Sequence, residues 1–382
     1  MKRGTTAVYG AGFLQGAAFV LIPALGTTLR SAPYDMSNTT YYGLLYFPEI
    51  IGAILAALTA GSVHGRLGSA GLFRLGVLCN AIAMGLLVTA SFTHGFTIIV
   101  LLLAETFLLG IGFGLTNAAI NRAASLLFAG AAAAAVTILN AVIGGATAIS
   151  PIILAGFQTV LTWDTWPAVL LTLWLGLMLL PQAGDSESNE QGGVGAWRRS
   201  MLPFAVGVMI YAICEGSFGS WANVLVSVDR HLPAATGALA LSVFWGGMTI
   251  ARFGLGAIPD HLIHRRIAYL LAPLGMAACF FIIPQLQAAA GLLVAFTAAG
   301  VACGIYYPYS MAYGIAAHPQ EGTQMAGLLV GALMVGEGIG SFGLGPLQQL
   351  ISLGNIYTWS ALWALPLLWL AWWNSRAPKK TA

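Results

Sequence analysis

Four acidic side chains lie inside long apolar segments, where an ionisable group is costly. They are Glu49, Glu105, Glu215 and Glu337. Placing an acidic residue at the centre of a bilayer costs about 3 kcal/mol on insertion scales. At such depth a carboxyl group is protonated, paired with another polar group, or exposed to a water-filled cavity. We therefore treat all four as candidates for proton coupling or gating, although hydrogen bonding between helices explains Glu49 and Glu337 at least as well.

Glu215 is the leading candidate because of its neighbours. Tyr211 lies four residues earlier and shares a helix face with it. Gly216 is small and lets another helix approach closely. In the first half of the chain, Gln15-Gly16 mirrors Glu215-Gly216. A carboxyl at this position could exchange a proton or accept a hydrogen bond from a ligand, and the structural alternative is a hydrogen bond to a neighbouring helix.

A polar stripe follows one face of the apolar segment 287–315. Tyr306, Tyr309, Ser310 and Tyr313 have the spacing i, i+3, i+4, i+7. Tyrosine offers an aromatic face and a hydroxyl, which suits a sugar-like ligand of mixed polarity. Packing in a protein core, with the hydroxyls satisfied locally, explains the stripe equally well.

The elements that must position these residues are membrane helices. Of 382 residues, 58% are hydrophobic and 7% are charged, against about 25% charged in a typical soluble domain. A span needs roughly 20 apolar residues. The chain holds twelve such runs, which we expect to be all-α transmembrane helices: 7–29, 40–61, 71–92, 96–120, 129–155, 159–181, 200–225, 235–257, 267–285, 287–315, 323–349 and 356–374.

Charge predicts the orientation of these helices. With the N-terminus inside, all but two of the 15 Lys and Arg residues fall on the inner side, as the positive-inside rule requires. Both termini are therefore expected to be cytoplasmic. The polar stretch 182–199 is predicted to be a flexible cytoplasmic linker between two six-helix domains, 1–181 and 200–382.

The two halves repeat each other at an offset of 194 or 195 residues. The matching landmarks are Gly43 with Gly237, Gly110-Ile111 with Gly304-Ile305, and Gly145…Pro151 with Gly340…Pro346. A duplicated six-helix unit is typical of transporters built from repeats.

With this architecture, the chain resembles the major facilitator superfamily over its whole length. The superfamily motif after helix 2, Gly-x-x-x-Asp-Arg-x-Gly-Arg, corresponds to residues 61–68 with Gly65 at the acidic position, and the copy after helix 8 keeps Asp260. The resemblance implies a central cavity lined by helices 1, 4, 7 and 10. It also implies a cytoplasmic latch, for which the candidates are Arg66, Arg252, Asp260, Arg265 and Arg266.

Within the superfamily, the chain is most similar to the fucose:proton symporter family. The similarity lies in Gly112–Asn121, Leu139–Gly145, Glu215–Trp221 and Trp245–Phe253. Two departures stand out, because Phe19 and Asn117 occupy the positions of that family's acids in helices 1 and 4. The fucose arrangement is therefore not expected, and proton coupling stays open. Asn117 remains a cavity candidate, and Glu105 points roughly 120° away from it on a helical wheel.

These patterns predict a secondary transporter that moves a small polar or amphipathic, sugar-like solute by alternating access. The expected substrate-binding residues are Gln15, Phe19, Asn117, Tyr211, Glu215, Tyr306, Tyr309, Ser310 and Tyr313. Three alternatives stay open: an efflux transporter for drugs or metabolites with the same fold, an intramembrane lipid-modifying enzyme, and a transporter-like receptor.

Motifs for other chemistries are missing. Neither GxxxxGK[ST] nor HExxH occurs, so we expect neither an ATP-driven pump nor a metal site. An intramembrane enzyme would need acids or histidines that converge near one membrane face, and the scattered acids here favour a protein that is not an enzyme and has no cofactor. The expected partners are a small-molecule substrate, protons and the lipid bilayer, without nucleic acid. We expect a monomer in the inner membrane of a bacterium.

Overall fold

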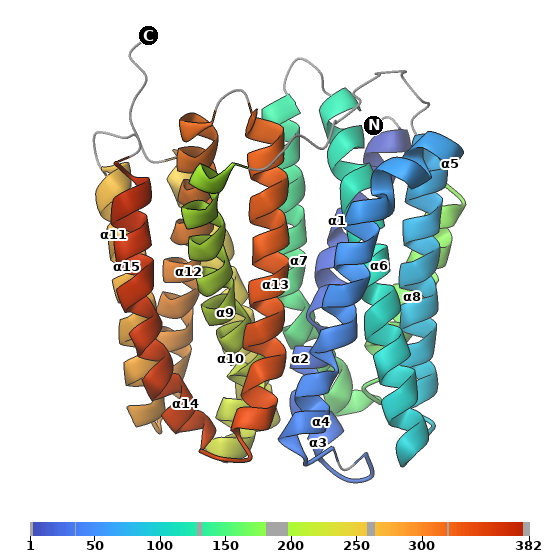
Figure 1. Cartoon of the computed structure of the whole chain (residues 1–382). Coiled ribbons are helices and arrows are strands. Elements are labelled where there is room, and N and C mark those ends of the chain that lie inside the picture. The colour runs from blue at the N-terminus through green and yellow to red at the C-terminus, as the bar shows by residue number, and fades with distance from the viewer. Residues whose placement is uncertain are drawn as a thin grey trace. The chain divides into compact units, whose positions relative to one another are not determined.

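The computed structural model of the chain describes residues 3–34, 36–127, 132–180, 198–257, 264–318 and 321–376 (Figure 1). Over these residues the regular structure is entirely helical, as predicted. The chain divides into two compact units, Met1–Ser188 and Asn189–Ala382. Of the predicted linker 182–199, all but the last two residues lie outside the described ranges, so its boundaries remain a prediction.

The N-terminal unit begins with a broken helix. Its elements are α1 (Arg3–Phe19), α2 (Leu21–Ala24), α3 (Gly26–Arg30), α4 (Thr39–Leu44), α5 (Tyr46–Ala90), α6 (Phe96–Leu127), α7 (Ala132–Val160) and α8 (Thr165–Met178). The predicted span 7–29 is thus split at Val20 and Leu25.

The break predicted between the spans 40–61 and 71–92 lies at Gly68, where a kink separates two helices within α5, so the connection is much shorter than the interval left between the two runs. The helix is interrupted only at Gly68, whose φ is 69°. This left-handed conformation is open to glycine without strain. Gly68 therefore separates the two predicted spans 40–61 and 71–92, and the polar residues before it are helical.

The C-terminal unit has a similar sequence of elements. They are the short helix η2 (Arg199–Met201), α9 (Leu202–Val224), the π-helical turn η3 (Leu225–Asp229), α10 (Ala234–Ala257), α11 (Arg265–Ile282), η4 (Ile283–Gln285), α12 (Ala289–Ala317), α13 (Gly322–Leu347), α14 (Leu353–Ser360), η6 (Ala361–Trp363) and α15 (Ala364–Asn374).

Eight helices among the described residues are long and apolar enough to cross a membrane. One of them, Thr39–Ala90, contains two of the predicted spans. All twelve predicted runs overlap helical structure. The chain is therefore an integral, multi-pass membrane protein.

The two units repeat the same close packing around a glycine. In the N-terminal unit, a Cβ added to Gly16 of α1 would strike the carbonyl oxygen of Ile143 on α7. In the C-terminal unit, a Cβ on Gly216 of α9 would lie 2.6 Å from the carbonyl oxygen of Glu337 on α13. This agreement supports the predicted equivalence of Gln15-Gly16 and Glu215-Gly216.

One of the predicted landmark pairs is shifted by a helical turn. A Cβ on Gly110 of α6 would strike the carbonyl oxygen of Glu49, and a Cβ on Gly300 of α12 would strike that of Phe244. Gly110 is therefore the packing counterpart of Gly300, at an offset of 190, and not of Gly304 at 194. The mismatch arises because glycines recur four residues apart on both helices, so that either register aligns small residues. On the corrected offset, Asn117 corresponds to Tyr307.

This contact makes Gly110 a sensitive position. We expect Gly110→Ala to lower the stability of the protein by about 1–3 kcal/mol, because the methyl group meets backbone that cannot yield easily. Gly85→Ala on α5 is the matched control, since no atom lies within 4 Å of its added Cβ. Thermal unfolding of both variants in one detergent measures the difference, and equal midpoints would contradict the close packing of α5 on α6.

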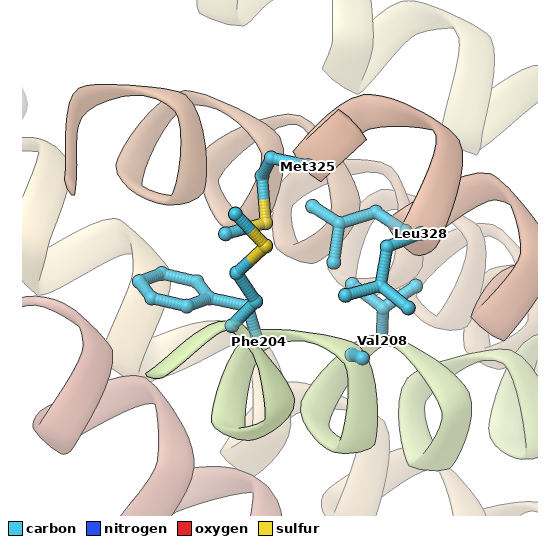
Figure 2. Packing of buried hydrophobic residues seen from close by; sticks show 7 residues of the cluster. Phe204, Val208, Met325 and Leu328 are labelled. Atoms are coloured by element: carbon cyan, nitrogen blue, oxygen red, sulfur yellow. The ribbon is translucent and has the colours of Figure 1, made fainter. Parts of the chain in front are cut away.

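Apolar side chains join α9 to α13 near their N-terminal ends. Figure 2 shows Phe204 and Val208 of α9 with Met325 and Leu328 of α13, all of them buried. Just before this cluster, Arg198 forms an ion pair with Glu321 at 2.6 Å. These contacts fix the start of α9 to α13 within the C-terminal unit. Glu215 lies further along the same helix.

Candidate functional site

The C-terminal unit contains a charge pair between the middle of α9 and the last part of α10. Oε1 of Glu215 on α9 lies 3.7 Å from Nη2 of Arg252 on α10. The Glu215 side chain is 7% exposed, whereas that of Arg252 is 42% exposed. This distance is an electrostatic contact and exceeds a hydrogen bond. Arg252, which the sequence assigned to the latch, therefore lies against the leading acidic candidate.

Two polar atoms beside this pair lack partners. Neither Oε2 of Glu215 nor the hydroxyl of Tyr211 makes a hydrogen bond with the described residues, although both are buried. The hydroxyl nevertheless lies beside both the carboxyl and Arg252, close to hydrogen-bonding range of each. Because buried polar atoms almost always have a partner, these two are the natural contacts for a ligand or a water molecule.

Aromatic rings border the pair. The ring of Tyr211 is stacked on Tyr306 and Tyr307, with centroids 5.4 and 6.3 Å apart and planes inclined by 15° in both cases. Tyr307 is half-buried and interacts electrostatically with both Glu215 and Arg252.

Trp245 is a second aromatic residue on the side of α10 that faces α9. One of its ring carbons lies 3.1 Å from the Cβ position of Gly219, one turn after Glu215. It precedes Arg252 by seven residues, so both share a face of α10. Sequence reasoning missed Trp245 and Tyr307. The spacing could have found Trp245, whereas the match of Tyr307 with Asn117 depends on the offset of 190 that the contacts of Gly300 establish.

The predicted tyrosine stripe of α12 packs mostly on Tyr269 of α11. The ring of Tyr306 is fully buried and lies 4.9 Å from that of Tyr269. Ser310 Oγ and the Tyr269 hydroxyl are 2.8 Å apart. Tyr309 and Tyr313 have ring contacts with Tyr269 at 6.3 and 5.4 Å. These contacts agree with the alternative in which the stripe packs in the protein core and does not line a ligand site.

In the N-terminal unit, the counterpart of Glu215 belongs to a neutral cluster. Gln15 is fully buried, and its Oε1 accepts a hydrogen bond of 3.0 Å from Nδ2 of Asn80. Asn80 also donates to Thr116 Oγ1 at 3.2 Å. Nε2 of Gln15 has no partner among the described residues. The two units therefore carry an uncharged and a charged version of one position.

The two residues at the departures from the fucose pattern are also uncharged and locally satisfied. Phe19 packs on Phe113 of α6, with ring centroids 5.4 Å apart. Oδ1 of Asn117 accepts a hydrogen bond of 2.8 Å from Asn121. Both side chains are half-buried.

The remaining acids do not join the charge pair. Glu105 is fully buried, and neither of its carboxyl oxygens has a hydrogen-bond partner among the described residues. Glu49 is half-buried and interacts electrostatically with Glu105. Glu337 is half-buried on α13, and its backbone carbonyl oxygen packs against Gly216 of α9. Their proposed part in proton transfer or gating remains a prediction.

The latch candidates occupy helix ends. Arg66 is exposed on α5 shortly before Gly68. Arg265 is exposed and Arg266 half-buried in the first turn of α11. Asp260 lies outside the described residues, so the latch itself stays a prediction.

Comparisons with known proteins identify the fold. No protein-family model matches the sequence, and no curated protein matches it. The structure is similar to the inward-open xylose transporter XylE from E. coli, with 12% identity over 99% of this chain and 97% of that one and a TM-score of 0.75. A D-xylose-proton symporter aligns with 14% identity over 98% and 97% of the two chains and a TM-score of 0.73.

A bacterial homologue of the human lysosomal transporter Spinster aligns with 14% identity over 98% and 96% of the two chains and a TM-score of 0.69. These identities are too low to carry over a substrate or a site residue. The likeness extends over nearly the whole length of each chain and agrees with the all-helical, apolar architecture. The chain therefore has the major facilitator fold.

Proposed function

We propose that this protein is a proton-coupled transporter for a small, sugar-like polar solute and that it works by alternating access. The observation that carries the proposal is the contact of Glu215 with Arg252 beside Tyr211, Tyr307 and Trp245. The xylose-proton symporter among the structural neighbours supports it at the level of the fold.

The chemistry of the site suits a carbohydrate. Aromatic side chains present a large apolar face together with a polar tip. Small-molecule sites combine such apolar walls with a few polar groups that fix the ligand's orientation. Here Tyr307 and Trp245 provide the aromatic faces, while the Glu215 carboxyl accepts a hydrogen bond from a ligand hydroxyl. The exposed part of Arg252 donates to a ligand oxygen.

The charge pair also suits proton coupling. A proton on the Glu215 carboxyl removes the negative charge that faces Arg252 and weakens the attraction between α9 and α10. Loss of the proton restores it. The pair thus links the protonation state of one residue to the contact between two helices, which is what a coupled transporter requires.

Three finer assignments belong to this proposal. The domains are 1–181 and 200–382 with the linker 182–199, and both termini face the cytoplasm of a bacterial cell. Membership of the fucose:proton symporter family is supported by the segments Gly112–Asn121 and Glu215–Trp221. Labelling of a cysteine at Asn355 by a membrane-impermeant maleimide from outside would check the orientation.

The experiment that tests the site uses proteoliposomes with an alkaline interior and a panel of labelled pentoses and hexoses. We expect Tyr307→Phe to raise the KM for the accepted sugar roughly fivefold, because the change removes the hydroxyl's hydrogen bond to a neutral ligand, which contributes about 1 kcal/mol. Tyr41→Phe is the control, since this exposed tyrosine carries the same change elsewhere. Equal KM values for the two variants would remove Tyr307 from the site, and failure of the whole panel would refute sugar transport.

A further inference from the structure

A groove runs between α11 and α12 in the C-terminal unit. Its volume is about 710 Å³, within the range of about 300–1,000 Å³ of small-molecule sites. None of its lining residues belongs to the charge pair or to the aromatic side chains beside it. The groove is therefore separate from the proposed solute site.

Hydrocarbon forms the walls of this groove. Ile267, Leu271 and Val294 line it and are 56%, 56% and 71% exposed. The lining includes one polar side chain, Thr297, whose hydroxyl donates to the carbonyl oxygen of Leu293 at 2.8 Å. A sugar or another polar solute would find no free side-chain partner here, because the one hydroxyl is already satisfied.

Small residues give the groove its depth. Ala272 and Gly275 of α11 face Ala298 and Ala302 of α12 in its lining. A Cβ added to Gly275 would lie 3.0 Å from that of Ala302, so the helix backbones approach closely there. The result is a narrow channel between larger side chains, the shape that fits an extended chain.

Positive charge lies at the end of the groove where α11 begins. Arg265 is the first residue of α11 and is followed by Arg266. It precedes Ala268 and Ala272 by three and seven residues, and therefore shares the groove's side of the helix. No acidic residue occurs in the first turn of α11. An anionic group is favoured at such a helix start by both the side chains and the helix dipole.

We propose that the groove holds one acyl chain of an anionic phospholipid whose phosphate lies against Arg265. Both parts of this ligand match the observed chemistry: hydrocarbon meets apolar walls inside a membrane, and the negative headgroup meets arginine at the end of the helix. A zwitterionic lipid would fill the groove but lose much of the attraction at its end. The proposal does not depend on the transported solute.

The test measures lipid retention by the purified full-length protein. Native mass spectrometry in dilute detergent follows binding of dioleoyl-phosphatidylglycerol and dioleoyl-phosphatidylcholine. We expect the wild type to prefer phosphatidylglycerol. Arg265→Gln should lower this preference roughly fivefold, the effect of one basic residue near an anionic surface. Arg74→Gln, an exposed arginine of the other unit, should leave it unchanged.

A second pair of variants tests the acyl chain. Ala298→Trp should fill the groove and abolish retention of both lipids. Ala278→Trp is the matched control, because Ala278 is exposed on α11 but does not line the groove. Retention of phosphatidylglycerol by Ala298→Trp at the wild-type level would refute the groove as the site. An unchanged preference in Arg265→Gln would refute the headgroup contact. Unfolding midpoints equal to the wild type establish that each variant is folded.

Discussion

Glu215→Gln is expected to abolish uphill accumulation of the substrate while preserving exchange of substrate between the two sides of the membrane. The amide keeps the size of the side chain and its capacity to accept a ligand hydrogen bond, but it cannot take up and release a proton. A gradient of one pH unit supplies about 1.4 kcal/mol per proton, or a tenfold accumulation for a one-to-one symporter. In the variant this accumulation should fall to the equilibrium ratio.

The measurement compares two fluxes in the same proteoliposomes. Uptake driven by an alkaline interior reports coupling, and exchange of labelled for unlabelled substrate at equal pH reports binding and alternation. Asp164→Asn is the control, because it makes the same carboxyl-to-amide change at the residue preceding α8. If Glu215→Gln still accumulates substrate when driven by pH alone, Glu215 is not the coupling group. Loss of both fluxes would instead assign it to ligand binding.

Most of the fold could be predicted from the sequence because a membrane imposes a strong pattern. Apolar runs of about 20 residues mark spans regardless of tertiary detail, and all twelve overlap helices. The errors occur where polarity and backbone conformation disagree. The segment before Gly68 contains His64 and Arg66, which resemble a loop, yet it is helical up to the glycine.

The sequence predicts that the two halves repeat each other, but it places the register of α12 against α6 one helical turn away from the register in the structure. Hydropathy and glycine spacing cannot distinguish registers that differ by one turn, since Gly300 and Gly304 both lie on the same face of α12. Only the atoms that each glycine approaches separate them. Gly300 packs on Phe244 as Gly110 packs on Glu49, and this contact fixes the offset at 190.

The candidate site could be predicted only in part, because sequence spacing does not reveal how one helix is rotated against its neighbours. The spacing on one helix identified Glu215 and Tyr211, because both lie on a single face. It could not identify Arg252, whose role depends on how α10 is rotated against α9. For α12, the spacing selected the stripe that packs on Tyr269 and missed Tyr307, one residue away. A difference of one residue turns a side chain by about 100°, and only the neighbouring helices decide which one meets the charge.

Arg252→Gln is expected to destabilise the protein, and adding Glu215→Gln should restore much of the loss. The single change leaves the carboxyl of Glu215, 7% exposed, without its cationic neighbour. Breaking a fully buried pair costs about 3–5 kcal/mol. Because the Arg252 side chain is 42% exposed, solvent screens this pair, and we expect about 1–3 kcal/mol. The stability of Arg252→Lys should lie between that of the wild type and that of Arg252→Gln, since lysine keeps the charge but lacks the planar fork of arginine.

The double-mutant cycle distinguishes an interaction from two independent effects. Thermal unfolding of the wild type, both single variants and the double variant in one detergent gives the coupling energy between residues 215 and 252. We expect the double variant to be more stable than Arg252→Gln, because the amide at 215 no longer needs a counter-charge. Strict additivity of the two losses would show that the 3.7 Å contact contributes nothing to stability. In that case the coupling mechanism, which depends on this attraction, would lose its physical basis.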